Sequence, residues 1–115
     1  MAKTIQSRKS KGRRLQQFVR DMILENFDHL EPDDVRSTSM GAGGEDVLLS
    51  PAARKVFPFS VECKNVEKIS LWSSLKQAET NAGKYMPLLV FKRNHSKTYA
   101  CLEMKDLMAL VKNQK

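Results

Sequence analysis

The 115-residue sequence has little cysteine and no long apolar run. Its two cysteines, Cys63 and Cys101, lie far apart and lack the C-x-x-C or Cys/His spacing of a zinc site. We therefore expect two reduced thiols in a reducing compartment. Apolar runs reach only four or five residues, as at 87–91, so we expect no membrane segment. The basic start is followed by no apolar stretch, which argues against a secretory signal and predicts a cytoplasmic protein.

Several other local signals are also missing. The glycine-rich segment 41–44 is not followed by Lys-Ser/Thr, so it predicts a turn and not a phosphate-binding loop. His29 and His95 are isolated in loop-like segments without partners for an HNH or zinc site, and both are expected at the surface. Trp72 is the only tryptophan; one such ring does not make a base-stacking track, so it is interpreted as a core anchor.

No acidic residue occurs in the first 14 positions. Residues 1–14 carry a charge of +6, whereas the rest of the chain holds 14 basic and 13 acidic groups, or +1. A basic tail on a nearly neutral domain suits a polyanion such as nucleic acid. A solubilising terminus without a ligand is the simpler interpretation. The predicted DNA contacts are Arg8, Lys9, Lys11, Arg13 and Arg14 in the tail, with Lys92 and Arg93 in a second basic cluster.

The length and the balance of 41% hydrophobic and 29% charged residues suit one globular domain with a modest core. We predict a basic tail over 1–14 and a single domain over 15–115. The order helix, three strands, helix, two strands, helix indicates an α/β domain with a central sheet flanked by helices. Hydrophobic periodicity predicts helices over 13–27, 69–82 and near 104–111, a helical turn within 51–58, and strands over 35–38, 46–50, 59–64, 88–92 and 98–102.

The segment FSVECKN, residues 59–65, reads as a strand with one apolar face and with Glu62 and Lys64 on the other. Asp46 begins the preceding strand, so pairing of the two strands would set it beside Glu62. Two such carboxylates repel, and a divalent cation removes the conflict because Mg²⁺ prefers oxygen ligands. Lys64 would then position or deprotonate a water, or offset charge on a phosphate. A surface ion pair, with Asp46 capping a turn, is the simpler alternative.

The segment GGEDVLLS followed by FSVECKN resembles the PD-(D/E)XK nuclease superfamily, whose restriction-endonuclease-like core places Asp on one strand and Glu-x-Lys on the next. The resemblance extends to Holliday junction resolvases and related phage nucleases, through Lys11-Gly12 and the segment 35–37. It covers residues 11–65, and the remainder only by element order. It implies a central mixed β-sheet, Asp46 and Glu62 as metal ligands with the Cys63 carbonyl, and Lys64 as the water-orienting group.

Two further positions follow from the same resemblance. Resolvases carry a glutamate on the first helix where this chain has Gln16, an amide that is a poor direct Mg²⁺ ligand but would hold a coordinated water. Glu25 would substitute only if it approaches the site. Gln77 matches the glutamine that several branches carry on the helix after Glu-x-Lys. It lies off the apolar stripe of its helix, where it would either line the edge of the site or simply be solvated.

The resemblance implies a metal-dependent DNA endonuclease that hydrolyses phosphodiester bonds, encoded by a phage or similar mobile element and acting in the host cytoplasm. The expected cofactor is Mg²⁺, with Mn²⁺ able to substitute. A chain this small offers little DNA-binding surface alone, so we expect a homodimer. Two alternatives stay open: a non-catalytic DNA-binding module that uses the basic tail, and a nuclease fold that has lost activity, for which Gln16 is the only indication.

Overall fold

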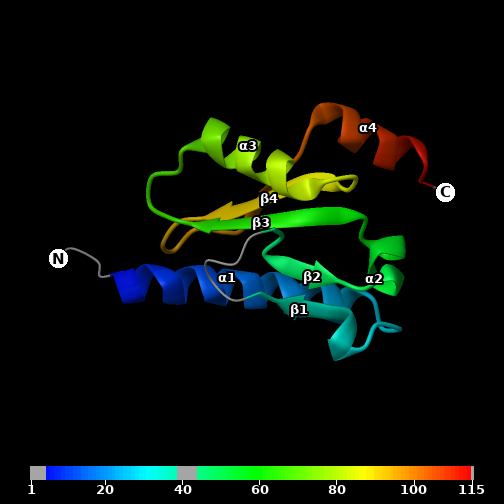
Figure 1. Cartoon of the computed structure of the whole chain (residues 1–115), viewed down its shortest axis with the longest axis horizontal. Helices are drawn as coiled ribbons and strands as arrows, with labels where there is room; N and C mark the ends of the chain where they lie inside the picture. Colours follow the sequence, from blue (N-terminus) through cyan, green and yellow to red (C-terminus); the bar gives the residue numbers. More distant parts are fainter. Residues whose placement is uncertain (1–4, 39–43, 115) are drawn as a thin grey trace.

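A mixed five-stranded sheet with helices on both faces forms the structure (Figure 1). The computed structural model describes residues 5–38 and 44–114, so most of the predicted glycine turn and the first four residues of the basic tail lie outside it. Its elements are α1 (Ile5–Asn26), η1 (Pro32–Asp34), β1 (Val35–Ser37), β2 (Val47–Leu49), α2 (Pro51–Val56), β3 (Phe59–Asn65), α3 (Leu71–Ala82), β4 (Met86–Lys92), β5 (Tyr99–Cys101) and α4 (Met104–Lys112).

The strands follow the chain order across the sheet, β1-β2-β3-β4-β5. Neighbouring strands are antiparallel except β3 and β4, which are parallel and are joined by α3. A parallel pair needs such a crossover because a tight turn cannot bring the chain back to the same end. The predicted α/β fold, its order of elements and its central mixed sheet are confirmed, and the architecture is that of a restriction-endonuclease-like core.

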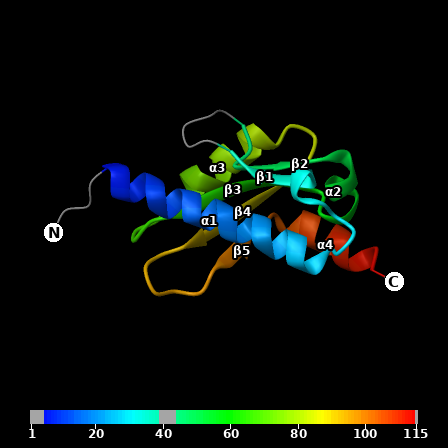
Figure 2. The ribbon, with the colours of Figure 1, turned by 90° about the horizontal axis from the view of Figure 1, so that it is seen from below.

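Helix α1 covers one face of the sheet and begins earlier than predicted. Its buried stripe of Leu15, Val19 and Ile23 packs against β1 and β3. The predicted start at Arg13 was wrong because the helix already begins at Ile5. The added turns include Arg8, Lys9 and Lys11, and these residue types favour a helix but are equally common in a solvated tail. Figure 2 shows α1 lying across the sheet, with β5 and the β4–β5 turn extending beyond it.

Helix α3 covers the opposite face through small side chains. Ser74, Ala78 and Ala82 are its buried residues, and they let the helix approach β3 and β4 closely. Gly83 ends the helix with a φ of 56°, a conformation that suits glycine. Trp72 is 82% exposed, so its interpretation as a core anchor was wrong. Small side chains, and not this ring, form the buried face of α3, and Trp72 lies at the rim of a hollow that Leu75 and Leu89 also line.

The helices of the described residues are all too short or too polar to cross a lipid bilayer. This agrees with the short apolar runs of the sequence.

Candidate active site

Strands β2 and β3 bring the two predicted carboxylates together. They pair antiparallel with Val47 opposite Val61, so that Asp46 and Glu62 lie opposite one another on the face turned away from α1. The Asp46 amide donates to the Val61 carbonyl at 2.9 Å, which holds the start of β2 against β3. The predicted pairing of these strands is therefore confirmed.

Asp46 is held by the backbone of β3. Its Oδ2 accepts a hydrogen bond from the Cys63 amide at 2.7 Å. Burial raises the pKa of Asp46 above 3.8, while the Cys63 hydrogen bond and the positive charge of Lys64 oppose the rise. This carboxyl group is thus fixed in position but poorly solvated, so its ionised form lacks a full set of stabilising partners.

Glu62 is more deeply placed, with 3% of the residue exposed. Burial raises its pKa above 4.5, and the negative charge of Asp46 raises it further. Asn81 Nδ2 on α3 donates to Glu62 Oε1 at 3.3 Å, and Lys64 Nζ lies 3.6 Å from Oε2. These contacts offset only part of the free-energy cost of burying the Glu62 carboxylate beside Asp46, because the pKa of Glu62 remains raised.

Cys63, between the two charged residues of the Glu-x-Lys motif, turns its side chain the other way. The thiol lies in the apolar core beneath α1. Burial raises the pKa of Cys63, and the neighbouring carboxylates add to the rise, so the thiol stays protonated. Its backbone amide and carbonyl are therefore the only Cys63 groups available to the site.

The donor atoms at this position suit a hard divalent cation. Within the part of the chain that the structure describes, no three His, Cys, Asp or Glu side chains form a potential metal cluster. Asp46 and Glu62 supply two carboxylates whose mutual repulsion a cation would relieve, and the strand adds a carbonyl. Mg²⁺ commonly takes one or two carboxylates and completes its octahedron with water and phosphate oxygens. The residues present therefore fit such an ion.

The first helix crosses the opposite face of the sheet and runs in the direction opposite to β3 (Figure 1). Asn65 Nδ2 donates to the Lys11 carbonyl at 3.3 Å, so this part of α1 lies beside the end of β3. Gln16 is 2% exposed and lies about 7.5 Å further along α1, the helix on the opposite face of the sheet from Asp46 and Glu62. Glu25 is exposed and about 13 Å beyond Gln16 along the axis, which makes Gln16 the better placed of the two.

Helix α3 contributes a residue that sequence reasoning missed. Gln77, the predicted contributor from this helix, is exposed. Asn81 follows it by four residues on the same side of the helix and contacts Glu62. The spacing of four residues from Gln77 was the only sequence signal for Asn81. This signal is weak, because the sequence does not distinguish Asn81 from an ordinary polar residue on a helix.

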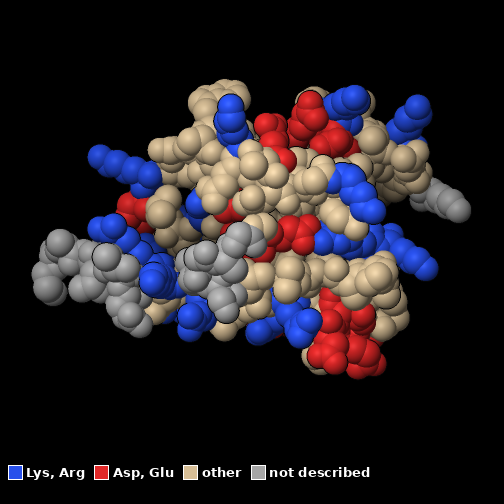
Figure 3. Space-filling view, viewed as in Figure 1, with Lys and Arg blue, Asp and Glu red and all other residues tan. Residues whose placement is uncertain are grey.

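The basic residues of the N-terminal segment separate into two groups. Arg8, Lys9, Arg13 and Arg14 are exposed, and Figure 3 shows Lys and Arg side chains gathered over the first half of α1, away from the acidic cluster around η1. Lys11 is 7% exposed, and its ammonium lies 3.7 Å from Glu67 Oε2. Lys11 is therefore directed to Glu67, unlike the four exposed cations of the same helix.

Lys92 and Arg93 lie at the end of β4 and in the turn that follows, with Lys92 half-buried and Arg93 exposed. They extend the basic surface to the strand next to β3. Their predicted role in DNA contact remains a prediction.

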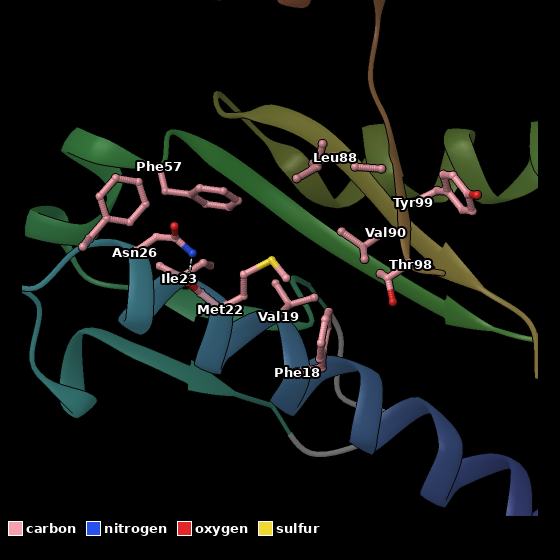
Figure 4. Close-up of a pocket in the computed structure, with 12 residues that line it drawn as sticks. Phe18, Val19, Met22, Ile23, Asn26, Phe57, Leu88, Val90, Thr98 and Tyr99 are labelled. Atoms are coloured by element: carbon pink, nitrogen blue, oxygen red, sulfur yellow. Dashed lines mark hydrogen bonds between the residues drawn. The ribbon is translucent and has the colours of Figure 1, made fainter. Parts of the chain in front are cut away.

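A separate apolar hollow lies on the α1 side of the sheet (Figure 4). It measures about 370 Å³, lies between α1 and the β4–β5 strands, and is lined by residues such as Phe18, Met22 and Val90. In Figure 4 Asn26 turns to the Met22 carbonyl, at 2.7 Å. No acidic or basic residue lines this hollow, so it lacks the groups that phosphodiester hydrolysis needs.

Comparison with known proteins identifies the family. The sequence matches the family described as "Phage putative PDDEXK endonuclease" over residues 7–115. Neither the comparison with curated proteins nor that with solved structures gives a match. The family match spans nearly the whole chain and includes both strands of the Asp46–Glu62 site. The chain thus belongs to this phage PD-(D/E)XK endonuclease family, whose superfamily generally uses divalent metals.

Proposed function

We propose that the protein is a divalent-metal-dependent DNA endonuclease that acts in the host cytoplasm, with Mg²⁺ as the cofactor and Mn²⁺ as a substitute. The observation that carries the proposal is the pairing of Asp46 with Glu62 across β2 and β3, with the Lys64 ammonium 3.6 Å from Glu62. Membership in the endonuclease family supports the nuclease activity, and the raised pKa values of both carboxyl groups support the metal.

Asp46, Glu62 and the Cys63 carbonyl would hold the cation. Such an ion would neutralise charge on the scissile phosphate and lower the pKa of a nearby water. The Cys63 amide keeps Asp46 in place, and Asn81 orients one oxygen of Glu62. Lys64 would orient the attacking water or stabilise negative charge that develops on the phosphate.

The exposed cations of α1 would bind the DNA backbone. Arg8, Lys9, Arg13 and Arg14 project from one helix, and Lys92 and Arg93 extend the surface across β4. Each phosphate contact to duplex DNA steepens the salt dependence of log K by about 0.9. Changing Arg13 and Arg14 to Gln should therefore weaken binding and flatten this slope, without changing the metal requirement. An unchanged slope of log K against log salt concentration would show that this face of α1 does not contact DNA.

We further propose a homodimer that forms through α4. None of its residues is buried, although four apolar side chains follow one face of the helix. They are Met104, Leu107, Met108 and Val111, each between 39% and 67% exposed. Charges of both signs accompany them, which suits a second copy of the same face better than a polyanion. The charged residues are Glu103, Lys105, Asp106 and Lys112.

Analytical ultracentrifugation tests the dimer. Met108→Glu should yield monomers, and a wild type that is monomeric at every concentration would contradict the dimer.

A cleavage assay tests the proposed function. Purified protein would be incubated with duplex, single-stranded, nicked and branched DNA, with Mg²⁺, with Mn²⁺ and with EDTA. We expect metal-dependent products from the wild type and none from Asp46→Asn. Preference for the four-way branch would indicate a structure-specific enzyme similar to Holliday junction resolvases. DNA binding without cleavage under every condition would favour the non-catalytic binding module instead.

A further inference from the structure

An aromatic row continues the active-site face of the sheet beyond Lys64. The register pairs Lys64 with Phe91 on β4, and Phe91 with Tyr99 on β5. Paired residues on neighbouring strands share a face and lie about 5 Å apart. The Phe91 and Tyr99 rings have centroids 6.3 Å apart and planes inclined by 34°. An aromatic surface therefore begins one strand away from the residue proposed to act at the phosphate.

A pocket of about 370 Å³ lies at this row, at the end of the sheet where the parallel strands β3 and β4 finish. Its apolar wall consists of Phe91 and Tyr99 with Val66 and Ile69. Tyr99 is 55% and Val66 39% exposed, so the wall is open to a ligand. Its polar rim carries Lys92, Arg93, Ser96 and Glu67. Stacking surface and cations therefore occur side by side.

The rim of this pocket is tied in place by hydrogen bonds. Glu67 Oε2 accepts the Asn94 amide at 2.7 Å and also pairs with the buried Lys11, which offsets its negative charge. The Arg93 amide donates to Ser96 Oγ at 3.0 Å across the turn. The β4–β5 turn is thus attached to both α1 and the segment after β3. A pocket formed in advance loses less entropy when it binds a ligand.

We propose that this pocket binds an unpaired nucleotide of the DNA substrate, with its base stacked on Tyr99 and Phe91 and its phosphate near Lys92 and Arg93. The inference rests on the proposed nuclease function and specifies its substrate. A base inside a duplex is already stacked on both faces, whereas an unpaired base offers its face to an aromatic side chain. The enzyme should therefore favour DNA with a single-stranded tail or branch next to the cleaved bond.

Equilibrium binding in EDTA tests the pocket separately from cleavage. Fluorescence anisotropy would compare a blunt duplex with the same duplex carrying a short single-stranded tail. The wild type should bind the tailed DNA more tightly. Tyr99→Leu should weaken binding of tailed DNA by about fivefold or more, the range measured for loss of one base–aromatic stack, and should leave blunt duplex unchanged.

Trp72→Leu is the matched control, because Trp72 is the more exposed ring but lies outside this pocket. It should leave the preference for tailed DNA intact. A second measurement needs no variant: 2-aminopurine in the tail should change fluorescence when the wild-type protein binds. Equal affinity of the wild type for both DNAs, an equal loss on both DNAs in Tyr99→Leu, or unchanged 2-aminopurine emission would each overturn the inference.

The result is separable from the proposed function. If the protein cleaves DNA but shows no preference for tails, the proposed nucleotide-binding role of the pocket is wrong and the proposed nuclease function is supported. If the protein binds tailed DNA through Tyr99 but cleaves no DNA with any metal, the role of the pocket is supported and the nuclease function is wrong.

Discussion

Glu45 and Asp46 are adjacent in the sequence, yet their carboxylates meet opposite surroundings. Arg54 Nη2 donates to both carboxylate oxygens of Glu45, at 2.7 Å to Oε1, and both side chains are largely buried. Arg54 also donates to the Phe59 carbonyl at 2.8 Å and stacks 3.7 Å above the Tyr85 ring. Asp46 instead faces the carboxyl group of Glu62, with its own pKa raised by burial.

The difference separates a carboxylate that holds the fold together from one that we propose to bind a metal. A carboxylate paired with a buried guanidinium holds elements together, because Arg54 on α2 reaches Glu45 before β2 through Nη2 and the Phe59 carbonyl at the start of β3 through Nη1. Two carboxylates opposite each other reduce the stability of the metal-free fold and favour a cation. Sites that carry chemistry commonly break a rule that the rest of the fold obeys. The neighbouring Glu45 anchor would keep Asp46 in place despite that repulsion.

The largest expected effect is on catalysis. Lys64→Ala should lower the cleavage rate by about 100- to 1000-fold, the usual cost of removing one electrostatic contact to a transition state. DNA affinity should change little, because the exposed cations of α1 remain. Lys55→Ala on α2 is the control and should keep full activity. Equal rates for Lys64→Ala and the wild type would exclude Lys64 from the chemistry.

Breaking the structural pair should instead cost stability. Arg54→Met leaves Glu45 buried without its partner, and we expect a loss of about 3 kcal/mol in the free energy of unfolding. Arg20→Met removes a pair with Asp21 that is far more exposed, so it should cost less than about 1 kcal/mol. Urea unfolding of both variants checks the contrast. Similar losses from the two would mean that the Glu45–Arg54 pair has no special role.

Glu62, whose pKa is raised, and Asp34, whose pKa is lowered by hydrogen bonds, should change the stability of the fold with pH in opposite directions. Because the folded-state pKa of Glu62 is raised, the metal-free protein loses stability as the pH rises through 4.5 and then through that raised value. Glu62→Gln should therefore gain stability relative to the wild type between pH 4 and pH 7. Ser50 and the Glu31 amide lower the pKa of Asp34, so its contribution is lost as the pH falls below 3.8. A pH-independent difference between Glu62→Gln and the wild type would contradict the account.

A smaller effect is expected on α3. Asn81→Ala removes the hydrogen bond to Glu62 and should slow cleavage by about threefold to tenfold, the equivalent of roughly 0.7–1.4 kcal/mol. Gln77→Ala, at an exposed position one turn earlier, tests the residue that the superfamily resemblance favours. The structure predicts the larger loss for Asn81, with most of it restored in Asn81→Gln. A larger loss for Gln77 would reverse this assignment.

Local patterns in the sequence predicted most of the fold and the pairing of strands that sets Asp46 opposite Glu62. Alternation in FSVECKN indicated both faces of β3, and the acid before the second strand indicated the partner of Glu62. Helix propensity could not distinguish a basic tail from the first turns of α1, because the same residues suit both. The Glu45–Arg54 pair and the Asn81 contact depend on how helices sit on the sheet, which local periodicity does not contain. Trp72 was misassigned because aromatic size suggests burial, whereas small residues determined how α3 packs.

Metal binding measured by thermal unfolding tests the central claim most directly. A cation that binds only the folded state stabilises it by about 2.7 kcal/mol at a hundredfold excess over its dissociation constant. We predict that Mn²⁺ raises the melting temperature of the wild type and of Glu45→Gln, but not that of Asp46→Asn. A response shared by all three proteins, or absent from all three at saturating Mn²⁺, would show that Asp46 and Glu62 do not form a metal site.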